Sequence, residues 1–447
     1  MSGPRALWSL TAGELAAGYA AGTFGPVAVL ESVLERHDVV NPRFNAVVTL
    51  DRDGARRAAG ESEVRLKAGA PLSDLDGVPV TVKDNILVAG MRATWGSRLF
   101  SDFVPPRDET PVARLRAAGA VILGKTNVPE FTVQGVTDNA LFGPTRNPLA
   151  PALTPGGSSG GAVAAVAAGI GPLALCTDGG GSIRRPAAHT GLMGLKPSRD
   201  LVPRRDGFPA ILHDFEVAGP IGRTVADIRA MLRIIARTDA ISQDSRTPDP
   251  CRIAFIPQFG DAPVDPGIAT SVAGAAERFA SLGHAVERLD DFRLADPINA
   301  VWPMISETGV AWLLDAHADD AHLVGPDAVA MAHRGRARAA TAYLETLQVI
   351  AQARESFDDL FGRFDILLTP TTAAQPWPIG IAFPDRIGGL PVGPRGHAVF
   401  TVFANALGLP ALSIPGRPDA SGLPVGIQLC GPVGTDDRLL ALADQFG

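Results

Sequence analysis

Cysteine, lysine and long apolar segments are all scarce in this chain of 447 residues, and each scarcity excludes a class of protein. The three cysteines, Cys176, Cys251 and Cys430, are widely spaced and odd in number. That usage argues against a disulfide framework and for reduced thiols in a cytoplasmic protein. The sequence has no CxxC pair or Cys/His cluster of the kind that holds zinc. We therefore expect neither a metal nor any other cofactor.

Segments that would address the chain to a membrane or to nucleic acid are also missing. The N-terminus lacks a basic region followed by an apolar one, and the longest apolar run, Gly161–Cys176, is interrupted by Pro172. The net charge is −7, and no block of clustered Lys and Arg offsets it. These features predict no membrane and no nucleic acid among the partners, and a small-molecule ligand instead.

Lysine accounts for only four of the 40 basic residues, and these are Lys67, Lys83, Lys125 and Lys196. Arginine cannot be deprotonated in a protein, whereas a buried lysine can lose its proton. Any basic side chain of this type that acts as a general base must therefore be one of these four.

The composition, 46% hydrophobic and 19% charged, is typical of a globular protein with a large core. Strand patterns such as Gly77–Val82 and Leu173–Thr177 alternate with helical ones, including one long helix expected at about Ala328–Phe361. This alternation predicts an α/β layered fold with a mostly parallel sheet. The polar stretch Ser242–Pro250 is the only plausible linker, and the apolar strands on both sides of it predict one continuous sheet.

Two glycine–serine motifs and one lysine suggest acyl-transfer chemistry. The motifs are PGGSSGG at Pro155–Gly161 and TDGGGSIR at Thr177–Arg184, and the lysine is Lys83 in VTVKDN. A serine hydroxyl can attack a carbonyl, and glycines let backbone amides converge on an oxyanion. Lys83 could deprotonate a serine only if burial lowers its pKa, so we expect it to be uncharged and Asp84 to point away from it.

Three other patterns compete with this interpretation. GAVILGKT at Gly119–Thr126 matches the Walker A string, but its variable residues read as a strand and would leave no phosphate-binding loop. GGSSG at Gly156–Gly160 matches a nucleophile elbow, but the prolines before it forbid the required strand. A Ser-x-x-Lys hydrolase is excluded, because no lysine has a serine three residues before it. A surface loop, a phosphate-binding nest or a plain tight turn also fits the glycine motifs, so the residues alone leave these alternatives open.

The sequence closely resembles the amidase signature family, and the resemblance covers nearly the whole chain. The matching segments are Asp76–Ile86, Gly124–Phe131, Leu141–Pro148, Thr154–Gly169, Thr177–Ser198, Val217–Asp227, Phe364–Thr371 and Gly422–Gly431. The resemblance implies a single domain over 1–447, with a signature region at about 76–230 and a remainder, 250–447, that completes the sheet and the substrate pocket. It also implies an α/β/α arrangement with a mixed, mostly parallel sheet covered by helices on both faces.

The resemblance further implies a Ser–cis-Ser–Lys triad. Ser182 would be the acyl-forming nucleophile, Ser158 the bridging serine after a cis Gly157–Ser158 peptide, and Lys83 the general base. We expect the other site residues to be the amides of Gly179, Gly180, Gly181 and Ser182 as an oxyanion hole, the backbone of Thr132 against substrate, and Ser159, Asp178 and Arg184 as supports.

The predicted function is hydrolysis of a linear carboxamide to a carboxylate and ammonia or an amine. The alternatives are the glutaminase-type component of a tRNA-dependent amidotransferase and a binding protein on a retired amidase scaffold, against which the complete triad argues. A homodimer is expected because many members of the family pair. Specificity is expected to come from Ala295–Val324 and Ala374–His397, where four aromatic residues are candidates to line a pocket: Trp302, Trp312, Trp377 and Phe383.

Overall fold

The computed structural model describes residues 5–237, 241 and 249–447. One mixed sheet of eleven strands runs through the molecule, in the order β1-β3-β2-β4-β6-β5-β12-β13-β9-β7-β8. Strands from both sides of residues 242–248 belong to this sheet, which confirms the expected continuity. The expected linker at Ser242–Pro250 lies largely outside the described residues, and the division at 76–230 and 250–447 stays a prediction.

The strands are short, and most are buried along their whole length. Their bounds are β1 Val47–Leu50, β2 Pro79–Lys83, β3 Val121–Thr126, β4 Leu173–Asp178, β5 Met193–Lys196, β6 Val217–Gly222, β7 Arg252–Phe255, β8 Ala285–Arg288, β9 Ile366–Pro370, β12 Ala411–Pro415 and β13 Gly426–Cys430. A separate hairpin pairs β10 Arg386–Ile387 with β11 Leu390–Pro391.

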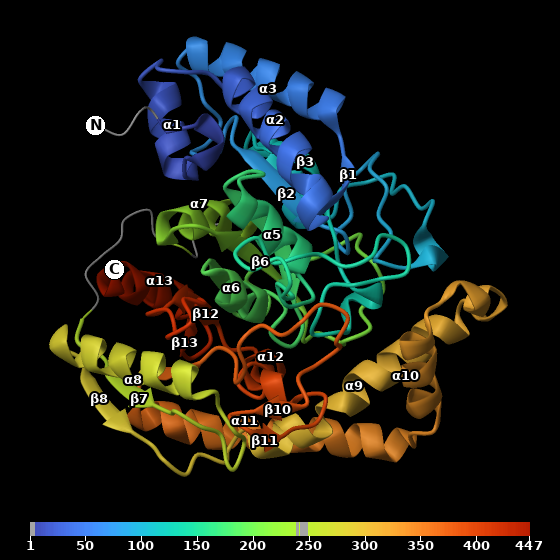
Figure 1. Cartoon of the computed structure of the whole chain (residues 1–447), viewed down its shortest axis with the longest axis vertical. Coiled ribbons are helices and arrows are strands. Elements are labelled where there is room, and N and C mark those ends of the chain that lie inside the picture. Colours follow the sequence, from blue (N-terminus) through green and yellow to red (C-terminus); the bar gives the residue numbers. More distant parts are fainter. Residues whose placement is uncertain (1–4, 238–240, 242–248) are drawn as a thin grey trace.

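Helices cover both faces of the sheet, and α3 and α11 lie near opposite ends of the long axis (Figure 1). Their bounds are α1 Ala12–Ala20, α2 Pro26–Phe44, α3 Arg52–Lys67, α4 Thr110–Ala117, α5 Gly160–Ala168, α6 Arg184–Thr190, α7 Val225–Ile235, α8 Pro266–Ser281, α9 Asp296–Asp315, α10 Pro326–Arg336, α11 Ala340–Arg363, α12 Val402–Leu407 and α13 Asp436–Phe446.

Strand direction divides the sheet into three parts. Parallel pairs join β3, β2 and β4 at one end and β9, β7 and β8 at the other. Antiparallel pairs join β4, β6, β5, β12, β13 and β9 between them, and β1 closes the first end antiparallel to β3. The expected mixed sheet is confirmed, with parallel pairing confined to its two ends in the described part of the chain.

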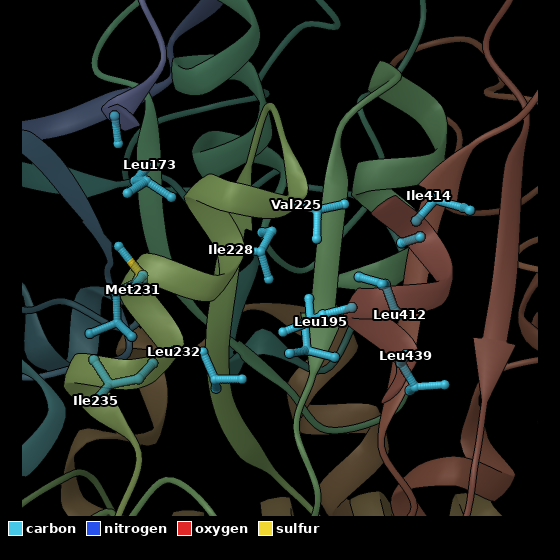
Figure 2. Packing of buried hydrophobic residues seen from close by; sticks show 14 of the residues in the cluster. Leu173, Leu195, Val225, Ile228, Met231, Leu232, Ile235, Leu412, Ile414 and Leu439 are labelled. Atoms are coloured by element: carbon cyan, nitrogen blue, oxygen red, sulfur yellow. The ribbon is translucent and has the colours of Figure 1, made fainter. Parts of the chain in front are cut away.

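Alternating side chains on the buried strands supply apolar cores on both faces of the sheet. On β4, Leu173 and Leu175 belong to the core under α7 and α13, whereas Ala174 and Cys176 belong to the core under α5 and α6. Successive side chains of a strand point to opposite faces, so one apolar strand can serve both layers. Figure 2 shows the first core, where the apolar face of α7 lies against the sheet.

Of two local expectations, the strand in GAVILGKT is confirmed and the single long helix is wrong. GAVILGKT folds as strand β3 through Thr126, so it forms no phosphate-binding loop. The helix expected at about Ala328–Phe361 is instead two helices, α10 and α11, separated at residues 337–339. Glu307 of α9 pairs with Arg334 before the break and with Arg338 within it. No helix in the described ranges is long and apolar enough to cross a bilayer.

Candidate active site

The candidate site lies where two neighbouring parallel strands end. β2 ends at Lys83 and β4 at Asp178, and the two strands are hydrogen-bonded side by side. The carboxyl ends of parallel neighbours meet at one edge of a sheet, where α/β proteins bind ligands. The loop that carries Ser158 leads into α5, and the loop that carries Ser182 leads into α6. The fold therefore brings the lysine and both glycine–serine motifs together.

Lys83 is fully buried and makes three polar contacts. Its Nζ lies 2.9 Å from Ser158 Oγ, 3.0 Å from the carbonyl oxygen of Thr177 and 3.0 Å from Thr177 Oγ1. A neutral amine has two N–H groups and one lone pair. With both N–H groups donated to the Thr177 oxygens, the lone pair is left to accept the Ser158 hydroxyl proton.

Burial makes that neutral form more accessible than it is for a lysine in water. Burial lowers the pKa of Lys83 to about 8, against an opposing contribution from the negative charge of Glu216. Asp84 does not pair with Lys83, because its Oδ1 lies 3.3 Å from the Nζ of Lys125 and its Oδ2 accepts the backbone amide of Thr94. The expectations that Lys83 is buried and that Asp84 points away are both confirmed.

The two serine motifs contact each other directly. The Gly157–Ser158 peptide is cis, as the resemblance implies. The backbone amide of Ser159 donates to the carbonyl of Ser182 at 3.2 Å, and Ser159 Oγ lies 3.4 Å from the carbonyl oxygen of Thr177. Ser159 thus ties the Ser158 loop both to the Ser182 loop and to the strand end that holds Lys83.

A buried ion pair braces the Gly179–Ser182 loop. Asp178 accepts the amides of Gly181 and Ile183 and pairs with Arg184 at 2.9 Å. Burial disfavours the charged carboxylate, but the Arg184 guanidinium outweighs this and holds the pKa of Asp178 well below its usual range. Arg184 also donates to Asn405 and Gln428, so α12 and β13 are tied to the same loop.

These contacts correct one part of the predicted oxyanion hole. The Gly181 amide donates to Asp178 Oδ1 at 2.7 Å, so it is already bonded to a carboxylate and cannot serve an oxyanion. The amides of Gly179, Gly180 and Ser182 have no hydrogen-bond partner in the described part of the chain. The φ of +110° at Gly181 turns the loop at this point, a conformation that glycine adopts readily.

A cavity of about 760 Å³ opens onto this loop. Ser182, Gly179 and Gly180 line it, together with Thr132, whose φ is +60°. Much of the remaining wall comes from α9 and from the segment 382–399, which fall largely in the two regions expected to set specificity. It is completed by residues 133–135, Arg185, Leu212 and two residues of α10. Trp302 and Phe383 line the cavity, as the sequence suggested. Trp312 is instead 57% exposed, and Trp377 packs on His189 and on the cavity residue His397.

A model of the family described as Amidase matches residues 28–440. The chain belongs to the amidase signature family. Membership indicates an enzyme that acts on the C–N bond of amides, either a hydrolase or an amidotransferase.

Curated relatives and solved structures of the family differ in activity. The A subunit of glutamyl-tRNA(Gln) amidotransferase from Carboxydothermus hydrogenoformans is 34% identical and is aligned over 98% of this chain and 97% of its own length. Its counterpart from Symbiobacterium thermophilum is 35% identical, over 97% and 95%. A bacterial aryl acylamidase has a TM-score of 0.89 at 28% identity, covering 98% of this chain and 95% of its own. The peptide amidase of Stenotrophomonas maltophilia has a TM-score of 0.81 at 27% identity, covering 98% and 96%.

Several residues of this family member's site were not found from the sequence. Thr177 accepts two hydrogen bonds from the Lys83 amine. Its position near the end of a strand and just before the glycine run could have identified it from the sequence. Arg185 and His397 meet in the cavity wall at 2.8 Å although 212 positions separate them. No local pattern connects such distant residues, so only the tertiary structure reveals them.

Proposed function

We propose that the chain hydrolyses a linear carboxamide through an ester formed on Ser182. The observation that carries the proposal is the buried Lys83 amine, 2.9 Å from Ser158 Oγ and hydrogen-bonded to the strand that leads into the Ser182 loop. A lysine with this environment is a base near neutral pH, and a serine beside it can pass a proton on.

In the proposed first step, Ser182 Oγ attacks the amide carbonyl carbon. Its proton passes to Ser158 Oγ while the Ser158 proton passes to the neutral Nζ of Lys83. The C–N bond then breaks, and the leaving nitrogen receives a proton back through Ser158. Water then attacks the carbonyl carbon of the Ser182 ester and gives a proton to Lys83 through Ser158. The ester C–O bond breaks and the proton returns to Ser182 Oγ, which releases the carboxylate and restores the free serine.

Backbone amides supply the charge stabilisation in this proposal. Those of Gly179, Gly180 and Ser182 are the candidates, since each lies on the cavity loop without a partner in the described part of the chain. Removal of one such donor typically raises a reaction barrier by about 3 kcal/mol. Thr132, on the cavity wall, is the proposed backbone contact to substrate.

A second candidate function is the glutamine-hydrolysing component of a transamidating complex. The names of the curated relatives favour it more directly than they favour an independent amidase. In that case the same triad would release ammonia from glutamine, and a partner protein would be required for full activity. A homodimer stays a prediction for the first candidate.

The test compares the purified chain with its Ser182→Ala variant on 4-nitroacetanilide and on glutamine. We expect the wild type to hydrolyse amides alone, and the variant to lose activity by at least about 10⁴-fold because no other group replaces the nucleophile. Retained turnover in a folded variant would overturn the proposal. Glutaminase activity that appears only with a co-purified partner would establish the second candidate instead.

A further inference from the structure

Two arginines in the cavity wall each have a buried nitrogen without an acceptor. Arg185, the first residue after Arg184 on α6, is 6% exposed, and its Nε has no hydrogen-bond partner within the described residues. The same is true of Nη2 of the half-buried Arg395, on the segment that forms another wall of the cavity. A buried guanidinium nitrogen left without an acceptor is costly, which points to a ligand that supplies one.

Neither arginine forms an ion pair with a carboxylate among the described residues, although the charge of Asp178 acts on Arg185. Arg185 Nη1 lies 2.8 Å from Nε2 of His397. Burial and the nearby guanidiniums hold the pKa of His397 well below its usual range, so the ring is neutral and Nε2 is the acceptor. Burial, with the charge of Arg395, lowers the pKa of Arg185 to about 9, and burial lowers that of Arg395 to about 10. Both guanidiniums stay charged at neutral pH and an anion would stabilise them.

The carboxylates near the cavity already form ion pairs with other arginines. Asp178 is held by Arg184. Glu307, which lines the cavity, is held by Arg334 at 2.6 Å and by Arg338 at 2.8 Å. Within the described lining residues, no acidic side chain is left to neutralise Arg185 or to bind a substrate ammonium group.

Arg185 also lies next to the proposed nucleophile. A Cβ placed on Gly181 would come within 2.7 Å of Arg185 Nε, and Gly181 immediately precedes Ser182. A cation so close to Ser182 is within reach of the acyl group that remains on the serine after the amine leaves.

We propose that the substrate is a carboxamide whose acyl part also carries a carboxylate, bound by Arg185 and Arg395, and carries no ammonium group. A monoamide of a short dicarboxylic acid has this chemistry. The proposal rests on the proposed amide hydrolysis and names its substrate class. It distinguishes this site from one built for glutamine, since glutamine adds an α-ammonium that would face two guanidiniums.

The test compares kcat/KM for three primary amides of equal carbon chain length: glutaramate, pentanamide and glutamine. Succinamate and adipamate extend the series to other lengths. We expect kcat/KM for the best acidic amide to be about 100-fold higher than for pentanamide or glutamine, a difference typical of the loss of one buried charge pair. In Arg185→Gln and Arg395→Gln the rate with the acidic amide should fall at least about 10-fold more than the rate with pentanamide. Arg288→Gln, an exposed arginine outside the cavity, should leave all ratios unchanged.

A binding measurement separates this inference from the chemistry. With Ser182→Ala, calorimetry should show glutarate binding at least about 10-fold tighter than pentanoate, and the difference should vanish in the double variant with Arg185→Gln. If the wild type cleaves neutral amides at least as well as acidic ones and the dicarboxylate does not bind more tightly, the inference is wrong while the amidase proposal stands. If no amide is cleaved, tighter glutarate binding alone would still support the anion site, and its absence would overturn both.

Discussion

At the residue scale, the environment of Lys83 decides whether its amine can act as a base. Burial and two Thr177 oxygens hold the amine beside Ser158, and the nearest acidic neighbour in sequence, Asp84, faces Lys125 instead. A carboxylate paired with Lys83 would keep it protonated, so the direction taken by Asp84 is as necessary as the burial itself.

The pH dependence of the reaction should report this lysine. The free enzyme's base must be neutral, and burial lowers the pKa of Lys83 to about 8, so kcat/KM should rise with pH and level off above about pH 8. The measurement is a pH profile with 4-nitroacetanilide, whose amide does not titrate in this range. Lys83→Arg should be inactive throughout, because guanidinium stays protonated. A flat wild-type profile from about pH 6 to about pH 9 would contradict this assignment.

The residues of the proposed triad could be predicted from the sequence, whereas Arg185 and His397 of the cavity wall could not. Lys83, Ser158 and Ser182 stand in motifs whose residue types and spacing are specific, and the structure brings their segments together. Arg185 and His397 meet only through the tertiary fold. The assignment of Gly181 to an oxyanion hole failed, because a glycine run alone does not show which amides a neighbouring carboxylate captures.

At the scale of elements, the loop between β4 and α6 depends on the buried Asp178–Arg184 pair. Asp178→Asn would keep an acceptor oxygen but leave Arg184 without its counter-charge, and breaking a buried pair typically costs about 3–5 kcal/mol. We expect a loss of this size in urea unfolding, with a fall in kcat as the loop shifts. Asp261→Asn, whose partner Arg293 is exposed, is the control and should change stability by less than about 1 kcal/mol. Equal stability of the two variants would contradict the bracing role.

At the scale of the whole molecule, one sheet joins the two regions of the chain. β5 pairs with β12, and α13 completes the core beneath α7. Alternating strands and helices predicted the layered α/β class, but the central antiparallel strands could not be foreseen. These strands pair with strands from distant segments of the chain, and the residue pattern of a buried apolar strand does not show whether it pairs parallel or antiparallel.

This continuity predicts that residues 1–237 do not fold alone. Without β12 and α13, the fragment would expose the edge of β5 and the apolar side chains of α7. We expect no cooperative urea transition by circular dichroism, whereas the full chain should unfold cooperatively. A fragment that unfolds in one sharp transition would show that the first region is an independent domain.

Trapping the acyl enzyme tests the central claim most directly. Turnover of 4-nitroacetanilide would be quenched with acid within the first cycles, and the digested protein would be mapped by mass spectrometry. The account predicts an acetyl group on the peptide that contains Ser182, and none in Ser182→Ala or Lys83→Arg. An acetyl group on Ser158 or Ser159 instead, or turnover with no acylated serine at all, would contradict it.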